Sequence, residues 1–136
     1  MKQHIYEHKV QYYETDQMGV VHHSNYIRWF EEARVDLFQT MGMGYGQMEK
    51  MGVISPVLEV HTTYKTMTHF EDTVQIQTKV KSYNGIVLEL SYEVKDKETG
   101  EIRCIGETKH CFLNREGKLI SMKKSYPDFN QMLERI

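Results

Sequence analysis

"SNYIRWFEEARVDLFQTMGMG", residues 24–44, predicts one long amphipathic helix. The apolar residues recur with the 3.6-residue period of an α-helix. They are Tyr26, Phe30, Ala33, Leu37 and Met41, with Ile27, Trp29 and Phe38 widening the stripe. Ser24 or Asn25 can cap the start of the helix, and the glycines after Met41 can end it. A stripe this broad favours a helix that packs against a large sheet face.

Much of the remaining chain carries the alternating pattern of β-strands. In residues 73–81, "TVQIQTKVK", Val74, Ile76 and Val80 face one way while glutamines and lysines face the other. Further strands are expected at residues 6–12, 57–67, 86–94 and 102–113, with a hairpin turn at Asn84-Gly85 and a short helix from Pro127 onward. We therefore predict an α+β fold, one domain over residues 1–136, with an antiparallel sheet wrapped around one long central helix.

The composition is that of a globular protein without a dominant charge. Hydrophobic residues make up 40% of the chain and the formal net charge is −2, which argues against nucleic acid as a partner. No apolar run reaches the roughly 20 residues of a membrane span, and the first residues lack a signal-peptide stretch. We expect a cytoplasmic protein. Cys104 and Cys111 are an odd number of residues apart in one predicted strand, so they should face opposite ways and not bridge each other.

Common catalytic and metal-binding motifs find no support in the sequence. No serine lies in a G-x-S-x-G turn, and "GMGYG" lacks the strand and lysine of a phosphate-binding loop. His4 and His8 share a strand face, but no further ligand cluster completes a site, so no metal is expected. His61, His69 and His110 are scattered and are interpreted as ordinary surface or buried histidines.

Asp16, His22 and His23 gather just before the predicted helix. In the simplest interpretation, Asp16 only caps a turn, as short acidic side chains often do. However, the start of a helix presents unpaired N–H groups and a partial positive charge, which can stabilise an oxyanion that develops on a carbonyl. A carboxylate a few residues upstream could hold a water molecule or attack directly. This arrangement suits a ligand with one reactive end and one apolar end.

Residues 12–34, "YYETDQMGVVHHSNYIRWFEEAR", resemble the signature of the 4-hydroxybenzoyl-CoA thioesterase family, which consists of hotdog-fold acyl-CoA thioesterases. The signature has an aromatic residue four positions before an acid, then a glycine, a valine and an Asn-Tyr pair, and an E-x-A-R segment on the central helix. The matching positions here are Tyr12, Asp16, Gly19, Val20, Asn25, Tyr26 and "EAR" at 32–34. The predicted order of strands and helix agrees with the hotdog fold that the resemblance implies.

The resemblance also implies roles for individual residues. Asp16 matches the catalytic acid, acting as general base or nucleophile. His23 matches the residue whose backbone N–H binds the thioester carbonyl, and in a related branch this position is itself a histidine implicated in catalysis. Another branch uses a helix carboxylate, which keeps Glu31 and Glu32 as secondary candidates. The substrate-binding candidates are Tyr12, Gly19, Val20, His22, Asn25, Tyr26, Lys81 and Ser82.

The implied function is acyl-CoA thioester hydrolysis, with no metal or separate cofactor. Lys65, Lys79, Lys81, Lys123 and Lys124 are the candidates for binding the CoA phosphates, and the acyl group should lie along the helix among Tyr26, Trp29 and Phe30. The resemblance further implies a homotetramer built from dimers, with the active site at a subunit interface. Two alternatives remain open, a thioesterase for acyl-carrier protein and a non-catalytic acyl-binding hotdog protein.

Overall fold

The long helix predicted from residues 24–44 is present as α1 (Ser24–Thr40). The computed structural model describes residues 4–136. The buried face of α1 carries the predicted apolar residues Tyr26, Trp29, Phe30, Ala33, Leu37 and Phe38. The helix ends at a glycine, as predicted: Gly42 has a φ of 90°, its N–H donates to the Gln39 carbonyl, and the Met43 N–H donates to the Phe38 carbonyl. This is the Schellman arrangement, in which a left-handed residue closes the last helical turn.

Two details of this helix were predicted wrongly. Ile27 is 41% exposed, because it lies on the flank of α1 that the sheet does not cover. No side chain caps the first turn. The Ser24 hydroxyl instead contacts His22, and the Asn25 side chain donates to the Glu14 carbonyl, so both polar groups serve the segment before the helix.

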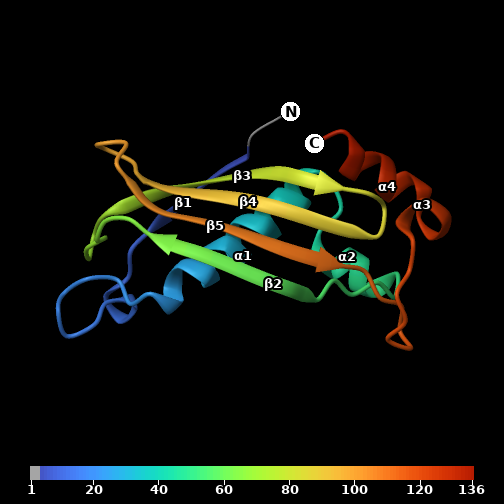
Figure 1. Ribbon diagram of the computed structural model, residues 1–136, viewed down its shortest axis with the longest axis horizontal. Helices are drawn as coiled ribbons and strands as arrows, with labels where there is room; N and C mark the ends of the chain where they lie inside the picture. The colour runs from blue at the N-terminus through green and yellow to red at the C-terminus, as the bar shows by residue number, and fades with distance from the viewer. Residues whose placement is uncertain (1–3) are drawn as a thin grey trace.

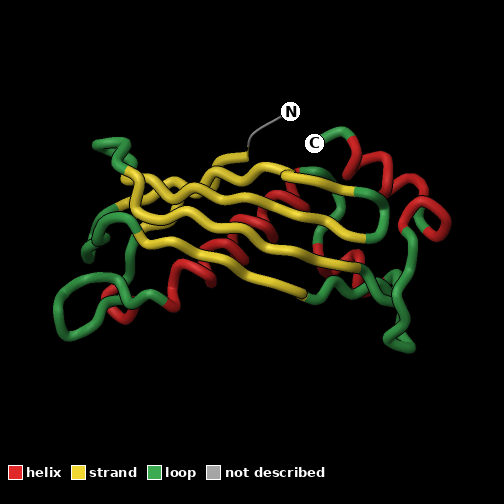
Figure 2. The backbone as a smooth tube through the Cα atoms, viewed as in Figure 1, coloured by secondary structure: helices red, strands yellow, loops and turns green. Residues whose placement is uncertain are grey.

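Five antiparallel strands form one sheet across α1 (Figure 1). They are β1 (His4–Lys9), β2 (Val57–Tyr64), β3 (Thr73–Tyr83), β4 (Val87–Asp96) and β5 (Ile102–Cys111). Their order in the sheet is β1-β3-β4-β5-β2, so β1 and β2 are the edge strands. The helix runs along one face of the sheet (Figure 2), which confirms the predicted α+β class.

Several strand ends differ from the prediction by a few residues: β5, for example, ends at Cys111 rather than Leu113. β1 ends at Lys9 rather than Tyr12, because the next residues turn into a short 3-10 helix, η1 (Tyr12–Glu14). The Glu14 carboxylate accepts the Gln11 N–H at 2.8 Å, which holds this turn. β2 ends at Tyr64 rather than Met67.

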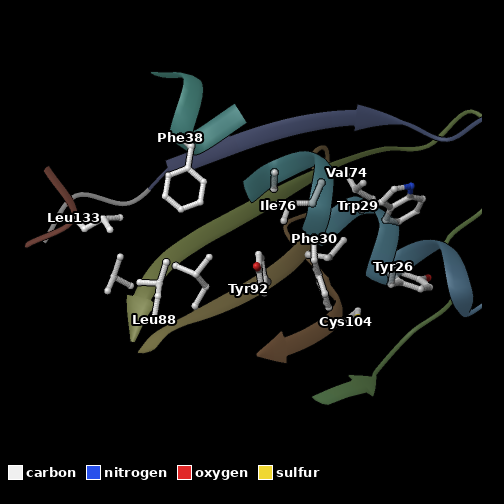
Figure 3. Packing of buried hydrophobic residues seen from close by; sticks show 14 of the residues in the cluster. Tyr26, Trp29, Phe30, Phe38, Val74, Ile76, Leu88, Tyr92, Cys104 and Leu133 are labelled. Atoms are coloured by element: carbon white, nitrogen blue, oxygen red, sulfur yellow. The ribbon is translucent and has the colours of Figure 1, made fainter. Parts of the chain in front are cut away.

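The inner sheet face and α1 enclose the core (Figure 3). Val74, Ile76 and Val80 point inward from β3, as predicted from their alternation. Phe30 is fully buried and its ring stacks on Tyr92, with centroids 4.4 Å apart. Gly106 in β5 lies against Phe30, and a Cβ atom at this position would come within 2.4 Å of the ring. The missing side chain therefore lets the helix approach the sheet closely.

Three short helices complete the fold: α2 (Tyr45–Lys50), α3 (Met122–Ser125) and α4 (Pro127–Glu134). α4 begins at Pro127, as predicted, whereas α2 was not predicted because the glycines around it were interpreted only as the end of α1. Cys104 and Cys111 are both buried and form no disulfide. Within residues 4–136, no helix has both the length and the apolar character needed to cross a membrane.

A polar chain of hydrogen bonds crosses the core from α1 to β5. The buried Arg34 guanidinium donates to Tyr45 on α2 at 2.9 Å and to Tyr92 on β4 at 3.1 Å. The Tyr92 hydroxyl bonds the Thr108 hydroxyl, which in turn bonds His110, both at 2.7 Å. Burial, and then the nearby Arg34 charge, lower the pKa of His110 from 6.5 to about 3. His110 is therefore neutral in the folded protein at neutral pH.

We expect this histidine to make the protein sensitive to acid. Below about pH 6.5 the unfolded chain protonates His110 but the folded chain does not, so stability falls as the pH drops toward 3. This one group should cost roughly 1.4 kcal/mol for each pH unit within that window. Urea unfolding at pH 7 and pH 5 measures the loss, which should be smaller in His110→Gln. An equal loss in both proteins would contradict the assignment.

Candidate active site

The segment from Glu14 to His22 folds into a small hairpin that carries Asp16 near its tip. The His22 N–H donates to the Glu14 carbonyl at 2.8 Å, and the Asp16 N–H donates to the Val20 carbonyl at 2.9 Å. Gly19, with a φ of 78°, closes the turn by donating its N–H to the Asp16 carbonyl. The positions of Gly19 and Val20 in the signature are thus explained by the turn that presents the acid.

The hairpin is fastened to the chain after β2. Val20 forms a β-bridge with His69, and the Val21 N–H donates to the Thr68 carbonyl at 2.8 Å. Thr68 also accepts a hydrogen bond from the hydroxyl of Tyr26 on α1 at 2.9 Å. The hairpin, this segment and the start of α1 therefore hold one another in place.

Of the two roles considered for Asp16 from the sequence, the structure shows the turn cap, and the catalytic role stays a prediction. One oxygen, Oδ1, accepts the Met18 N–H at 2.8 Å, so the side chain does cap the turn. The carboxylate is nevertheless only partly buried. A carboxylate has two acceptor oxygens, so Oδ2 is available to take a proton from a bound water molecule.

His23 is the residue directly before α1, and its backbone already has helical angles, φ −54° and ψ −29°. The His22 and His23 rings stack with centroids 4.2 Å apart, and the Ser24 N–H donates to Nδ1 of His22 at 3.2 Å. The Asn25 N–H donates to the His22 carbonyl. The His23 N–H itself makes no hydrogen bond within residues 4–136. It is thus a donor at the positive end of α1 that a substrate oxygen could use.

A cavity of about 240 Å³ opens beside His23 and Tyr26. Tyr64, at the end of β2, forms its opposite wall with Lys65 and Met67. The Tyr64 hydroxyl donates to the His23 carbonyl at 3.2 Å, and the Tyr26 and Tyr64 ring centroids are 5.4 Å apart. Tyr64 was not identified from the sequence. Its inward position in the alternating pattern of residues 57–64 was a signal, but strand position alone did not indicate that it meets His23.

The other predicted binding residues lie elsewhere in the isolated chain. Tyr12 is 76% exposed at the rim of the hairpin, where its ring meets Phe70. Lys81 lies on the outer sheet face, paired with Glu107 at 2.7 Å. Neither Lys81 nor Ser82 lines the His23 cavity. Of the candidate lysines, Lys65 does.

The secondary candidates and the N-terminal histidines also lie apart from this cavity. Glu32 bonds Tyr6 and His8 on β1, while Glu31 is exposed on α1. His4 bonds Asp36. Among the described residues, no three His, Cys, Asp or Glu side chains come together in a way that could hold a metal ion.

Glu14 is a second feature that sequence reasoning missed. It lies two positions before Asp16, yet its carboxylate is buried and accepts hydrogen bonds from His8 and Trp29, both at 2.8 Å, in addition to the Gln11 N–H. Burial opposes ionisation, but these hydrogen bonds outweigh it and lower the pKa of Glu14. The site therefore contains one partly exposed acid and one buried, fully bonded acid.

The fold is an antiparallel sheet packed on one central helix, with a cavity beside the start of that helix. The family model described as "Thioesterase-like superfamily" matches residues 10–133. The chain belongs to this superfamily and has its hotdog fold. The match does not single out the 4-hydroxybenzoyl-CoA subfamily, which stays a prediction.

Individual relatives cover between two thirds of the chain and nearly all of it. The Bacillus subtilis (strain 168) protein named "Putative acyl-CoA thioesterase YneP" is 35% identical over 130 residues, which span 95% of this chain and 94% of the relative. The crystal structure of a DHNA-CoA thioesterase from Staphylococcus aureus is 34% identical, with a TM-score of 0.94 over 99% of this chain and 91% of that one. The acyl-CoA thioester hydrolase YbgC of Escherichia coli O6:H1 is 26% identical over 66% of this chain and 67% of its own.

Proposed function

We propose that the protein hydrolyses acyl-CoA thioesters to a free acid and CoA, with Asp16 and the His23 N–H as the reacting groups. The observation that carries this proposal is that one short segment supplies both. A partly exposed carboxylate lies on the hairpin, and an unbonded backbone donor lies at the start of α1, next to a cavity with aromatic walls. The names of the relatives support the same reaction.

In the proposed mechanism Asp16 takes a proton from water, whose oxygen attacks the thioester carbonyl carbon. The carbonyl oxygen becomes an oxyanion, which the His23 N–H and the positive end of α1 stabilise. The C–S bond then breaks and CoA leaves as a thiolate, a leaving group that needs little protonation because thiols have a pKa near ~8.5. Direct attack by Asp16, giving a mixed anhydride, is the competing route. Neither route needs a metal or a separate cofactor.

The substrate class is proposed from the aromatic walls of the cavity and from the positive charge of Lys65 beside it. Tyr26, Tyr64 and the His23 ring offer aromatic surfaces to the acyl group. Aromatic acyl-CoA is therefore the first class to test, and the name of the DHNA-CoA thioesterase relative points the same way. Lys65, at the cavity, is the cation we assign to a CoA phosphate. Lys81 and Ser82 remain candidates only for a site that includes another subunit.

We also propose a homo-oligomer, built as dimers that pair into tetramers. The edge strand β2 exposes Val57, Leu58 and Val60, and an exposed apolar edge strand is a template for pairing with another chain. Tyr12 and Met18, at the hairpin, are also exposed apolar residues. Sedimentation as a stable monomer would contradict this proposed oligomer.

The two free, buried cysteines fit the reducing cytoplasm, which is the location we propose.

The direct test is thiol release from a panel of acyl-CoAs. The panel contains short, medium and long fatty acyl groups, benzoyl-CoA, 4-hydroxybenzoyl-CoA and 1,4-dihydroxy-2-naphthoyl-CoA. We expect the native protein to release thiol, with the highest kcat/KM on an aromatic member. An acyl-carrier-protein thioester is assayed beside the panel. If it alone releases thiol, the substrate is the acyl-carrier-protein thioester rather than acyl-CoA. Binding of acyl-CoA without thiol release would indicate an acyl-binding protein.

A further inference from the structure

Glu14, two positions before Asp16, is buried and only 4% exposed. Three donors converge on its carboxylate. His8 and the Gln11 N–H donate to Oε1, and Trp29 donates to Oε2, each at 2.8 Å. This side chain is too enclosed to touch substrate. Its hydrogen bonds instead join β1, η1 and α1 at one point.

The main chain of the same residue reaches the reacting groups. The Glu14 carbonyl accepts both the His22 N–H and the Asn25 side chain at 2.8 Å. The first bond closes the base of the hairpin that carries Asp16, and the second holds the first turn of α1. Glu14 is therefore one residue whose main chain joins the hairpin that carries Asp16 directly to the start of α1.

His8 extends this anchor to β1. Its Nε2 contacts Glu14, its Nδ1 lies 3.3 Å from Glu32, and its ring packs on Trp29 with centroids 4.9 Å apart. Tyr6 donates to the same Glu32 oxygen at 2.9 Å. Because β1 is itself hydrogen-bonded to β3, this cluster connects the hairpin to the rigid sheet.

We propose that Glu14 is a positioning residue, which fixes the distance between Asp16 and the start of α1. Turnover therefore depends on Glu14, although the Glu14 side chain never contacts substrate. The inference rests on the thioesterase activity proposed above. Small errors in placement are enough, since a misplacement of about 1 Å can cost roughly a hundredfold in rate.

The test compares Glu14→Gln with Glu14→Asp. A glutamine amide has one acceptor and one donor group, so in either orientation an N–H must face Trp29 or the Gln11 N–H. An aspartate keeps two acceptor oxygens on a shorter side chain. We expect kcat per folded protein to fall roughly ten- to hundredfold in Glu14→Gln, with KM changed less than about threefold, and to recover partly in Glu14→Asp.

The matched control is Asn130→Ala. Asn130 is also buried and hydrogen-bonded, but it lies on α4, at the opposite end of the molecule from the hairpin (Figure 1). It should lower stability and leave kcat unchanged. A native kcat in folded Glu14→Gln, or an effect on KM alone, would overturn the proposal, because Glu14 would then support only the fold.

Amide hydrogen exchange of His22, resolved by NMR, separates this inference from the proposed activity. Faster exchange at His22 in Glu14→Gln, with unchanged exchange at Val94 in the core, supports the positioning role. If the native protein releases no thiol from any acyl-CoA, the proposed function fails. Amide exchange at His22 alone then decides whether Glu14 positions the hairpin. Unchanged exchange at His22 would overturn the inference.

Discussion

The Asp16→Asn variant is expected to lose roughly 10²- to 10⁴-fold in kcat, the range that general base catalysis contributes. An amide cannot accept the proton of the attacking water, and it cannot attack the carbonyl itself. The substituted side chain keeps an oxygen in the same place, so it can still accept the Met18 N–H that holds the turn. Thiol release measures the rate. Calorimetric titration with a non-hydrolysable acyl-CoA thioether should show that binding is retained.

Asp36→Asn is the matched control for this experiment. Asp36 is also a carboxylate with a short hydrogen bond, to His4 at 2.7 Å, but it lies on the far half of α1. It should keep the native rate. Should Asp16→Asn hydrolyse acyl-CoA as fast as the native protein, Asp16 would be only a turn cap, and Glu31 and Glu32 would become the carboxylates to substitute.

The Gly106→Ala substitution is expected to cost roughly 3 kcal/mol of stability, the upper end of the usual penalty for overpacking a core. The added Cβ would lie 2.4 Å from the Phe30 ring and 3.0 Å from the His61 carbonyl oxygen. Phe30 cannot retreat easily, because Tyr92 stacks on it within the core. Urea unfolding followed by circular dichroism measures the loss.

Gly46→Ala provides the comparison. Gly46 lies in helix α2 with no atom within 4 Å of an added Cβ, so alanine should stabilise the protein by up to about 1 kcal/mol through its helix propensity. In Gly106→Ala, the further substitution Phe30→Leu should recover part of the loss. If Gly106→Ala unfolds at the native urea concentration, helix α1 does not approach the sheet as closely as described.

The long helix and the sheet could be predicted because their signals are local. The buried face of α1 follows one period, and β3 alternates over consecutive residues. The order of the strands was not predictable in this way. β1 pairs with β3, and β2 pairs with β5, which begins 38 residues after β2 ends. Such pairings depend on the packed core rather than on neighbouring residues.

The same difference between local signals and distant contacts decides which residues of the candidate site could be predicted. Asp16 and His23 are close in the sequence, so the helix start and the motif were enough to name both as candidates, and their joint role stays a prediction. Tyr64 reaches His23 from 41 positions away, and Glu14 is buried only because His8 and Trp29 come from separate elements. In the sequence, Glu14 is only an acid two positions before Asp16, and nothing in that pattern indicates that its side chain is buried. Lys81 was associated with the site by resemblance alone, and its ion pairs place it on the outer sheet face.

The hairpin that carries Asp16 has a consequence for how such enzymes diversify. The proposed acid and oxyanion donor belong to one continuous stretch, residues 14–25, which closes its own turn by hydrogen bonds between its residues and is joined to the cavity wall by few others. The opposite wall, with Tyr64, Lys65 and Met67, comes from a separate stretch after β2. Evolution can therefore exchange the wall, and with it the preferred acyl group, while the chemical step is inherited unchanged.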